Sequence, residues 1–303
     1  MQQTTDTLLL VRPFSFRKNE QTAVNNYFQS DLPSDTANAD AQAEFDGFVS
    51  KLQSAKINTI ILQDSGQWDT PDSIFPNNCL STHQGIAVLY PMFAENRRLE
   101  RNIDYVDHLQ KRGYKITEVV DYTPEESAHL FLEGTGCLIL DRINKIAYCS
   151  LSERAHEEVI SRFCKDLNYQ PCIFEAKQSV AGERKAIYHT NVMLSVGQYF
   201  AVICLDSIDD VAQREKVLAQ LHHSKKTVII ISEAQMHAFA ANILEVKSTE
   251  GNPFIIMSST AYHSFDNSQR EALAQFGALI HTPLNTIETG GGGSARCMVA
   301  EIF

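Results

Sequence analysis

Short apolar runs typical of β-strands alternate with stretches in which apolar residues recur at helical spacing, from one end of the chain to the other. Phe45, Phe48, Val49 and Leu52, for example, fall on one face of a helix. The pattern predicts strands at 7–11, 59–62, 116–120, 137–140, 146–149, 200–205, 228–231, 243–246, 254–257, 278–281 and 298–303. It predicts helices around 45–52, 99–109, 152–163, 209–222 and 268–276. We therefore expect an α/β fold.

The alternation returns with a rough period of about 50–60 residues, but the units share no convincing sequence identity, so it only suggests a repeat. No Gly/Ser-rich or Pro-rich linker interrupts the chain, which favours a single domain over residues 1–303. The polar stretch 19–40 lacks a clean period. Because loops of that length are often functional, it is read as a surface loop or a lid.

Composition narrows the class of protein. The chain has 303 residues, of which 44% are hydrophobic and 21% charged, as in an ordinary globular protein. Its net charge of −11 is unfavourable for phosphate binding, which needs clustered Lys and Arg. Arg97, Arg98 and Arg101 form a dense basic stretch, but acidic residues interleave with it, as on a solvated helix face. We expect no nucleic-acid partner.

Membrane and extracellular classes are also disfavoured. No apolar run approaches the ~20 residues that span a bilayer, and residues 8–11 are too few for a signal peptide and lack its basic flank. The seven cysteines are an odd number without C-x-x-C or C-x-x-H pairing. This favours a reducing compartment, the cytoplasm, with neither a disulfide framework nor a structural metal. Most of the thiols are expected to be buried and inert.

One cysteine stands apart because four glycines precede it, in the segment Gly290-Gly-Gly-Gly-Ser-Ala-Arg296-Cys297. Glycines permit unusual backbone angles and close approach of a ligand to the main chain. A thiol beside backbone N–H groups and Arg296 could be held as the nucleophilic thiolate. The alternative is a flexible turn followed by a buried cysteine.

Two further residues are candidates for acid–base chemistry. His189, in Tyr-His-Thr-Asn, begins an apolar stretch and is either a general acid/base or a structural histidine. Glu133 stands directly before Gly134 between apolar neighbours. A carboxylate buried there without a partner would be costly, so it is either a turn or capping residue or a functional acid.

Two polar segments complete the set of candidates. The first, Pro-Asp-Ser-Ile-Phe-Pro-Asn-Asn at 71–78, contains Asp72 and Asn78 and is also typical of a turn. The second, Ser-Leu-Ser-Glu-Arg at 150–154, contains Arg154, and its Ser152 is equally suited to cap the following helix. Neither segment is decisive by itself.

Taken in order, these motifs resemble those of the arginine deiminase, dimethylarginine hydrolase and amidinotransferase superfamily. The shared features are Arg-Pro after the first strand, Pro-Asp-Ser-x-Phe, Glu-Gly, Ser-x-Arg, a late His and a glycine-rich loop that ends in Cys. The resemblance covers nearly the whole chain. It is nearest to a bacterial branch of citrulline-utilisation hydrolases, which carries Arg-Pro-Phe-x-Phe and Phe-Pro-Asn-Asn, as at 12–16 and 75–78 here.

The resemblance implies a five-bladed, pseudo-symmetric α/β propeller with a central site. It implies that Cys297 is the nucleophile, that His189 and Glu133 are its catalytic partners, and that no metal or organic cofactor is required. It also implies that Arg97 (or Arg98) and Arg154 lie near the amino-acid end of a small substrate. Planar guanidinium groups suit the recognition of a carboxylate. Oligomeric state is not visible, and a homo-oligomer is compatible with the sequence.

A departure from the superfamily bears on the substrate. Members that act on a guanidinium often have Asp where this chain has Asn78 and Asn191. A buried guanidinium needs carboxylate partners, whereas a neutral ureido group matches an amide, which both donates and accepts. Asn78 and Asn191 therefore favour citrulline over arginine. Asn78 has more weight, because dimethylarginine hydrolases vary at the second position.

The expected reaction is attack of Cys297 on the ureido carbon of citrulline, yielding ornithine, ammonia and carbon dioxide. Three alternatives stay open. The first is a hydrolase of guanidino substrates, such as arginine or methylated arginine. The second is an amidinotransferase, which differs only in the nucleophile that reaches the intermediate. The third is a non-catalytic binding protein of the same fold, which the Cys, His and Glu set disfavours.

Overall fold

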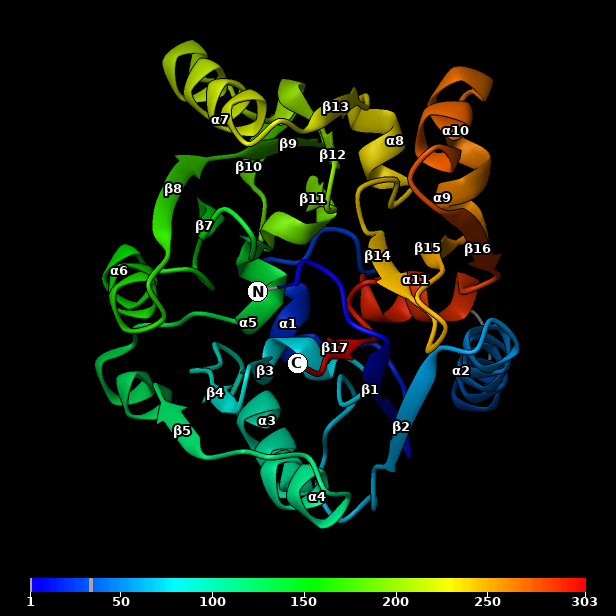
Figure 1. Cartoon of the computed structure of the whole chain (residues 1–303). Helices are drawn as coiled ribbons and strands as arrows, with labels where there is room; N and C mark the ends of the chain where they lie inside the picture. Colours follow the sequence, from blue (N-terminus) through cyan, green and yellow to red (C-terminus); the bar gives the residue numbers. More distant parts are fainter. Residues whose placement is uncertain (1, 33–34) are drawn as a thin grey trace.

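Five three-stranded sheets follow one another along the chain in the computed structural model, which describes residues 2–32 and 35–303 (Figure 1). Their strand orders are β17-β1-β2, β3-β4-β5, β6-β7-β8, β11-β12-β13 and β14-β15-β16, and a two-stranded ribbon, β10-β9, stands apart. The strands of the first three sheets are β1 Thr7–Arg12, β2 Asn58–Gln63, β17 Ala300–Glu301, β3 Leu80–His83, β4 Ile86–Leu89, β5 Glu118–Asp121, β6 Ile139–Asp141, β7 Ile146–Leu151 and β8 Gln170–Glu175. The others are β9 Lys177–Val180, β10 Glu183–Ala186, β11 Leu194–Val196, β12 Phe200–Ile203, β13 Thr227–Ile230, β14 Leu244–Lys247, β15 Pro253–Ser258 and β16 Ala278–Thr282.

All five sheets share one topology, in which the middle strand pairs antiparallel with one neighbour and parallel with the other. In the second sheet, for example, Leu80 lies opposite Leu89 in the antiparallel pair and Ile86 opposite Glu118 in the parallel pair. The first sheet is built from both ends of the chain, since β17 pairs with β1. The sheets are arranged around the middle of the molecule (Figure 1), and none of those formed by the described residues closes on itself. The α/β class is therefore confirmed, and the five-bladed propeller stays a prediction.

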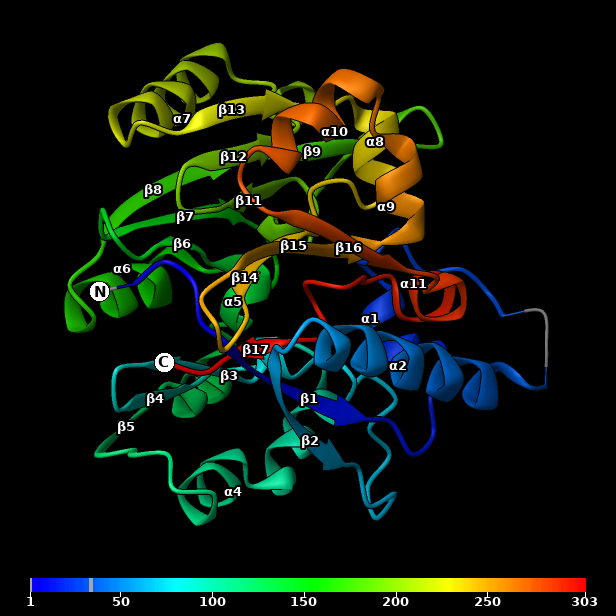
Figure 2. The same ribbon diagram turned by 45° about the vertical axis from the view of Figure 1, so that its right-hand side comes forward.

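Helices connect the strands and lie mainly on the outside. The longer ones, such as α2, α4, α7 and α10, are peripheral, whereas the short α1 and α5 lie near the middle (Figures 1 and 2). Their bounds are α1 Glu20–Ala23, α2 Ala37–Ser54, α3 Glu95–Arg98, α4 Tyr105–Lys111, α5 Gly134–Cys137, α6 Glu157–Asp166, α7 Val211–His223, α8 Glu233–His237, α9 Ser259–Ser264, α10 Asn267–Ala274 and α11 Asn285–Gly291. Within 2–32 and 35–303, no helix is long and apolar enough to cross a membrane.

Three local predictions are wrong at their boundaries. The helix expected at 99–109 is broken at Asp104, whose left-handed backbone (φ 52°) separates a 3₁₀ turn, Leu99–Ile103, from α4. The helix expected from 152 begins only at Glu157. Ser152 does not cap it, because its hydroxyl donates to the Tyr188 carbonyl and His156 holds the N-cap position. The strand expected at 137–140 starts at Ile139, because α5 occupies 134–137.

The hydrophobic pattern does not predict six of the strands, namely β3, β4, β8, β9, β10 and β11. β3, β9, β10 and β11 have three or four residues each, and the ribbon strand β10 consists of exposed and half-buried residues, including Glu183, Arg184 and Lys185. Such segments show no clear alternation of apolar and polar positions. The longer buried strands are found close to where the pattern places them, because β1 and β15 present continuous apolar runs to the core.

Candidate active site

A small pocket near the middle of the molecule collects most of the residues singled out from the sequence. It is narrow, with a cavity volume of about 10 Å³. Its walls are formed by Thr22, Asn26, Asp72, Phe75, Asn78, Arg97, Arg154, Tyr188, His189, Gly291, Gly293 and Cys297. Glu133 and Asn191 do not line the pocket, but each is hydrogen-bonded to a residue that does.

The thiol of Cys297 lies at the end of the glycine loop that follows α11. Gly292 has a left-handed backbone (φ 62°), and a Cβ atom at Gly291 would lie 2.6 Å from the Phe75 ring. Larger residues would therefore push this loop away from the pocket wall. Two amide nitrogens reach the sulfur: Nδ2 of Asn191 at 3.2 Å and Nδ2 of Asn242 at 3.1 Å.

Arg296 does not support the thiol as the sequence led us to expect. Its guanidinium turns away and donates to the Val299 carbonyl and to Glu301, both at 3.0 Å. Asn242, which does contact the sulfur, was missed. Its only signal in the sequence is that it is an amide within the otherwise apolar run 238–244, at a position that proves to be fully buried.

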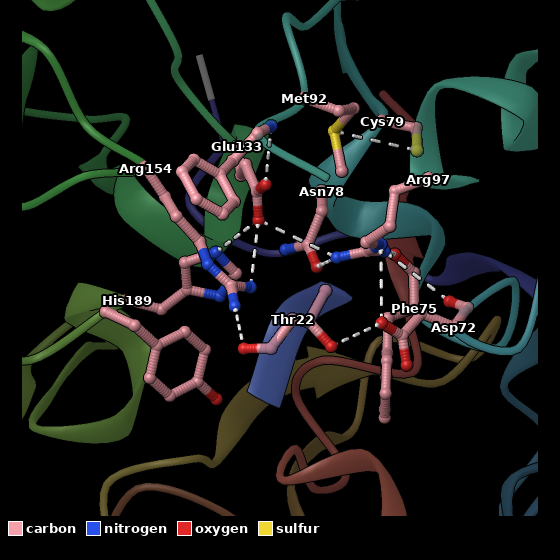
Figure 3. Close-up of polar contacts among 12 residues, drawn as sticks. Thr22, Asp72, Phe75, Asn78, Cys79, Met92, Arg97, Glu133, Arg154 and His189 are labelled. Carbon is pink, nitrogen blue, oxygen red and sulfur yellow. Dashed lines mark hydrogen bonds and ion pairs between the residues drawn. The ribbon is translucent and has the colours of Figure 1, made fainter. Parts of the chain in front are cut away.

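His189 and Glu133 form a buried pair beside the pocket (Figure 3). Nε2 of His189 lies 2.8 Å from Oε2 of Glu133, whose other oxygen accepts the Phe93 N–H at 3.0 Å. Burial alone would raise the pKa of Glu133. Arg154, the hydrogen bond from His189 and Arg97 together hold it far below its usual value. The carboxylate is therefore ionised and is an acceptor only.

Burial acts on His189 in the opposite direction, since it disfavours the charged imidazolium. It lowers the pKa of His189 to about 4, although Glu133 partly opposes the change. The ring is thus neutral near pH 7. Because an ionised carboxylate accepts at Nε2, the single ring proton resides on Nε2 and leaves Nδ1 as the basic nitrogen.

Arg97, not Arg98, faces the pocket. Arg98 donates to the carbonyls of Met92 and Phe93, whereas Arg97 is buried at the pocket wall. The reading of this stretch as a solvated helix face is wrong for Arg97 and for its partner Glu100, which are 2% and 0% exposed. Nε and Nη2 of Arg97 donate to the two oxygens of Glu100 at 2.8 and 3.0 Å.

Arg97 also fixes the orientation of Asn78. Its Nη1 donates to Oδ1 of Asn78 at 2.8 Å (Figure 3). The amide nitrogen of Asn78 therefore points the other way, and it is a buried donor without a partner among the described residues. Gly136 allows this arrangement, because a Cβ atom there would lie 2.4 Å from Nδ2 of Asn78 and 2.7 Å from Nδ1 of His189.

The segment 19–32 contributes Thr22 and Asn26 to the pocket wall and also contacts the glycine loop that precedes Cys297. Oδ2 of Asp72 accepts from Asn19 at 2.8 Å and from Thr22 at 3.1 Å, while Oδ1 is buried without a partner among the described residues. Arg154 donates to the Thr22 carbonyl at 2.8 Å and to Asn25. The stretch 19–40 is thus not one loop, because it contains α1 and the start of α2. Residues 33–34 of it lie outside the described residues.

No group of three or more His, Cys, Asp or Glu side chains suited to a metal ion occurs within 2–32 and 35–303. The seven cysteines, all within the described part, are buried and free of disulfides. The chemistry available in the pocket is therefore that of a thiol, an imidazole–carboxylate pair, amides and guanidinium groups. These are the types of group that nucleophilic catalysis uses as nucleophile, base and orienting group.

Comparison with known proteins gives the family of the chain that carries this pocket. The chain belongs to the family described as N,N dimethylarginine dimethylhydrolase, eukaryotic, whose model matches residues 12–303. The resemblance to the arginine deiminase, dimethylarginine hydrolase and amidinotransferase superfamily is thereby confirmed. At the level of this family, so is the expected class, a hydrolase of carbon–nitrogen bonds other than peptide bonds.

Solved structures share the fold at low sequence identity. ArgZ, an arginine dihydrolase from the ornithine–ammonia cycle in cyanobacteria, superposes with a TM-score of 0.76 at 17% identity over 98% of this chain. The match covers 40% of the ArgZ chain, so the present chain spans about two fifths of that relative. The N-terminal domain of ArgZ bound to substrate matches with a TM-score of 0.73 at 17% identity, over 98% of this chain and 97% of the domain.

A dimethylarginine dimethylaminohydrolase variant carrying an adduct of S-methyl-L-thiocitrulline matches with a TM-score of 0.66 at 13% identity. The match covers 98% of this chain and 99% of that one. No curated protein matches the sequence. The similarity to these solved structures shows the fold.

Proposed function

We propose that this enzyme hydrolyses the ureido group of citrulline to ornithine, ammonia and carbon dioxide through a covalent intermediate on Cys297. The orientation of Asn78 carries the proposal. Because Arg97 occupies Oδ1, the amide offers the pocket Nδ2, a buried donor that lacks a partner among the described residues. A ureido oxygen accepts such a hydrogen bond, whereas every polar group of a guanidinium is itself a donor.

Asn191 complements Asn78. Its Nδ2 is engaged by the sulfur of Cys297, and its Oδ1 is a buried acceptor without a partner among the described residues. A ureido group has one carbonyl acceptor and N–H donors. Asn78 would hold the carbonyl, and Asn191 would accept from an N–H, with the carbon between them near Cys297. A group left unsatisfied in such a site costs about 1–3 kcal/mol, so the amide pattern discriminates between substrates.

The amino-acid end of the substrate would bind on the opposite side. Oδ1 of Asp72 is a free acceptor suited to the α-ammonium group. Arg154 suits the α-carboxylate, which would take the place of the Thr22 carbonyl and Asn25 on its guanidinium. Arg97 is assigned a different role from the one expected, because Glu100 and Asn78 already engage its donors. It positions Asn78.

In the first chemical step, Cys297 transfers its proton to Nδ1 of His189 and attacks the ureido carbon. Glu133 stabilises the imidazolium that forms, 2.8 Å away. The imidazolium then protonates the δ-nitrogen of the collapsing adduct, the carbon–nitrogen bond breaks, and ornithine leaves. A carbamoyl group remains on the sulfur.

In the second step, neutral His189 removes a proton from water, which attacks the thiocarbamate carbon. The carbon–sulfur bond breaks, the thiolate is regenerated and is protonated by His189, and carbamic acid is released. Carbamic acid separates into ammonia and carbon dioxide. The protonation states at the end equal those at the start.

A second candidate is a hydrolase of guanidino substrates. It is favoured by the family description, which names dimethylarginine, and by ArgZ, which is described as an arginine dihydrolase. It requires a different set of contacts at Asn78, whose Nδ2 would oppose a guanidinium N–H. An amidinotransferase would use the same first step with an amine in place of water, and a non-catalytic binding protein would leave the Cys297, His189 and Glu133 set unused.

The remaining proposals concern the whole protein. Residues 1–303 would form one catalytic domain in which the five sheets are the blades of a propeller. Seven free cysteines agree with a cytoplasmic location. The ligand would be a small amino acid, with no nucleic-acid or membrane partner, and a homo-oligomer is compatible with this function.

The experiment is a product assay with citrulline, arginine and dimethylarginine side by side, using the wild type and Cys297→Ser. Ornithine formed from citrulline, and lost in the variant, is the expected result. If arginine yields citrulline or ornithine while citrulline yields no ornithine, the guanidino alternative is supported. Transfer would be recognised because product formation from any of the three would require an added amine acceptor.

A further inference from the structure

The surroundings of Cys297 differ from those of the other buried thiols. Cys79 and Cys137 donate their S–H to oxygen acceptors, Glu100 at 3.1 Å and the Arg154 carbonyl at 3.2 Å. Burial raises the pKa of both thiols, with Glu100 adding to the effect at Cys79 and the Cys149 thiol and Glu133 adding to it at Cys137. The sulfur of Cys297 instead accepts two N–H groups. Hydrogen bonds to the charged form of a group favour that form, so this arrangement favours a thiolate.

Asn242 is the more rigid of the two donors. It is fully buried in the connection between α8 and β14. Its Oδ1 accepts the backbone N–H groups of Arg296 at 3.1 Å and of Cys297 at 3.3 Å. Its Nδ2 donates to the Asn191 carbonyl at 3.2 Å and to the sulfur at 3.1 Å. These bonds fix the orientation of the amide, so that the nitrogen, not the oxygen, must face Cys297.

Among the described residues, no cationic side chain takes the place of these amides as a hydrogen-bond donor to the sulfur. Of the described residues, neither a Lys nor an Arg donates to the sulfur, and Arg296 is directed to Val299 and Glu301. His189 is neutral and therefore supplies no ion pair to the resting thiol. An anion that is buried without a counter-charge depends on its hydrogen bonds.

We infer that Asn242 is a catalytic residue that holds Cys297 in place and, together with Asn191, stabilises its thiolate with neutral N–H donors. The inference deepens the proposed function, since it concerns the nucleophile of the same reaction. It does not depend on the identity of the substrate. A neutral support leaves the sulfur more nucleophilic than a bound cation would, because no opposite charge is paired with it.

The test measures the rate at which iodoacetamide alkylates Cys297 between pH 5 and pH 10, with the site identified by peptide mass spectrometry and Cys297→Ser as the blank. Asn242→Asp is the main variant. It keeps an acceptor for the two backbone N–H groups but replaces the donor by a carboxylate oxygen. Asn242→Ser, which is smaller and keeps a hydroxyl donor, is the second variant.

In Asn242→Asp we expect the alkylation midpoint to rise by at least one pH unit, so that the rate at pH 7 falls about tenfold or more. At high pH the rate should return to that of the wild type. Asn242→Ser should shift the midpoint less, because its hydroxyl can donate to the sulfur. Asn96→Asp is the matched control: it places a carboxylate at another buried asparagine, one that pairs with Asn19 rather than with the sulfur.

Unchanged midpoints in Asn242→Asp and Asn242→Ser would overturn the inference, even if both variants lose activity. A shift equal to that of Asn96→Asp would do so too. Should Asn242→Asp fail to fold, as judged by circular dichroism, the comparison rests on Asn242→Ser and on Asn191→Asp, which alters the other donor. Because alkylation needs no substrate, failure of the citrulline proposal would leave this result intact, and the reverse also holds.

Discussion

Two sets of polar groups surround the pocket, one of neutral amides and one of buried charged pairs. Around the thiol, neutral amides supply the polar groups, since Asn78 lines the pocket beside Cys297 and Asn191 donates to the sulfur from outside the lining. Behind and beside this surface, charged groups are buried in mutual contact, with Arg97 against Glu100 and Arg154 against Glu133. A buried charge is tolerated when it is paired and hydrogen-bonded.

The difference shows which parts of the site bind charge and which exclude it. The guanidinium and carboxylate groups compensate one another and orient the groups that they touch. Arg97, itself held by Glu100, fixes the direction of the Asn78 amide. The amides then face a group that needs both donors and acceptors but carries no charge. The neutral amides would therefore set the substrate preference, and the charged pairs would position the groups that they contact.

Among the charged groups, a change at Glu133 is expected to have the largest effect on activity. Glu133→Gln keeps the shape of the side chain but cannot stabilise the imidazolium form of His189, and its amide can impose the wrong tautomer. We expect kcat to fall about 10²–10⁴-fold, as for other groups that orient a catalytic base. The measurement is steady-state release of ornithine from citrulline. A loss of less than about threefold would show that the 2.8 Å contact has no part in catalysis.

Asn78→Asp tests whether the neutral amides set the substrate preference. It removes the donor that faces the pocket and places a carboxylate where a guanidinium could bind. We expect kcat/KM for citrulline to fall about 10–100-fold, because the ureido carbonyl loses its partner. Activity toward arginine should rise relative to activity toward citrulline. Equal losses for both substrates would indicate a structural role for Asn78, and unchanged preference would contradict the account.

The buried imidazole links the site to stability. Burial lowers the pKa of His189 from 6.5 to about 4. The unfolded chain therefore binds a proton between these values that the folded protein does not, and the stabilisation present above pH 6.5 is lost as the pH falls toward 4. The full difference is about 3 kcal/mol. Urea unfolding of wild type and His189→Gln at pH 7 and pH 4.5 should show the wild type losing more stability on acidification.

The same shift predicts an acid limb of kcat/KM near pH 4 rather than near 6.5, because His189 must be neutral to accept the thiol proton. A limb at 6 to 7 would mean that the imidazole is protonated more easily than its burial allows. Equal acid sensitivity of wild type and His189→Gln in the unfolding experiment would lead to the same conclusion.

The smallest effect is expected in the segment 19–32. Asn25→Ala removes an acceptor from Arg154 but touches neither the sulfur nor the imidazole. We expect KM for citrulline to change by about threefold to tenfold with little change in kcat, since only the amino-acid end is affected. Val24→Ala is a matched control on the same segment, because its side chain is 62% exposed. A fall in kcat alone would place Asn25 at the chemistry instead.

The sequence predicts the parts of this site that local motifs record. Short motifs with glycines, serines or neighbouring apolar strands identify Cys297, Glu133 and Arg154 in the sequence. Continuous apolar runs predict the long buried strands. Asn242 and Glu100 could not be found in this way. Asn242 contacts Cys297, 55 positions away, whereas Glu100 is distinguished only by its burial, because an i,i+3 contact such as that with Arg97 also occurs on a solvated helix.

Local patterns also mislead where tertiary contacts prevail. The sequence around Arg97 alternates charges as a solvated helix does, yet Arg97 and Glu100 are buried because they satisfy each other. Serine is typical of a helix N-cap, but the Ser152 hydroxyl donates instead to the Tyr188 carbonyl. In both cases a polar side chain has a hydrogen-bond partner that the sequence pattern does not indicate.

The central claim, that Cys297 attacks the ureido carbon of citrulline, is tested most directly by trapping the intermediate. Citrulline labelled at the ureido carbon would be mixed with wild type and with Cys297→Ser, quenched in acid, and the peptides analysed by mass spectrometry. The account predicts a labelled carbamoyl group on the peptide that contains Cys297, and none in the variant. Label on another residue, or ornithine produced by Cys297→Ser at the rate of the wild type, would contradict it.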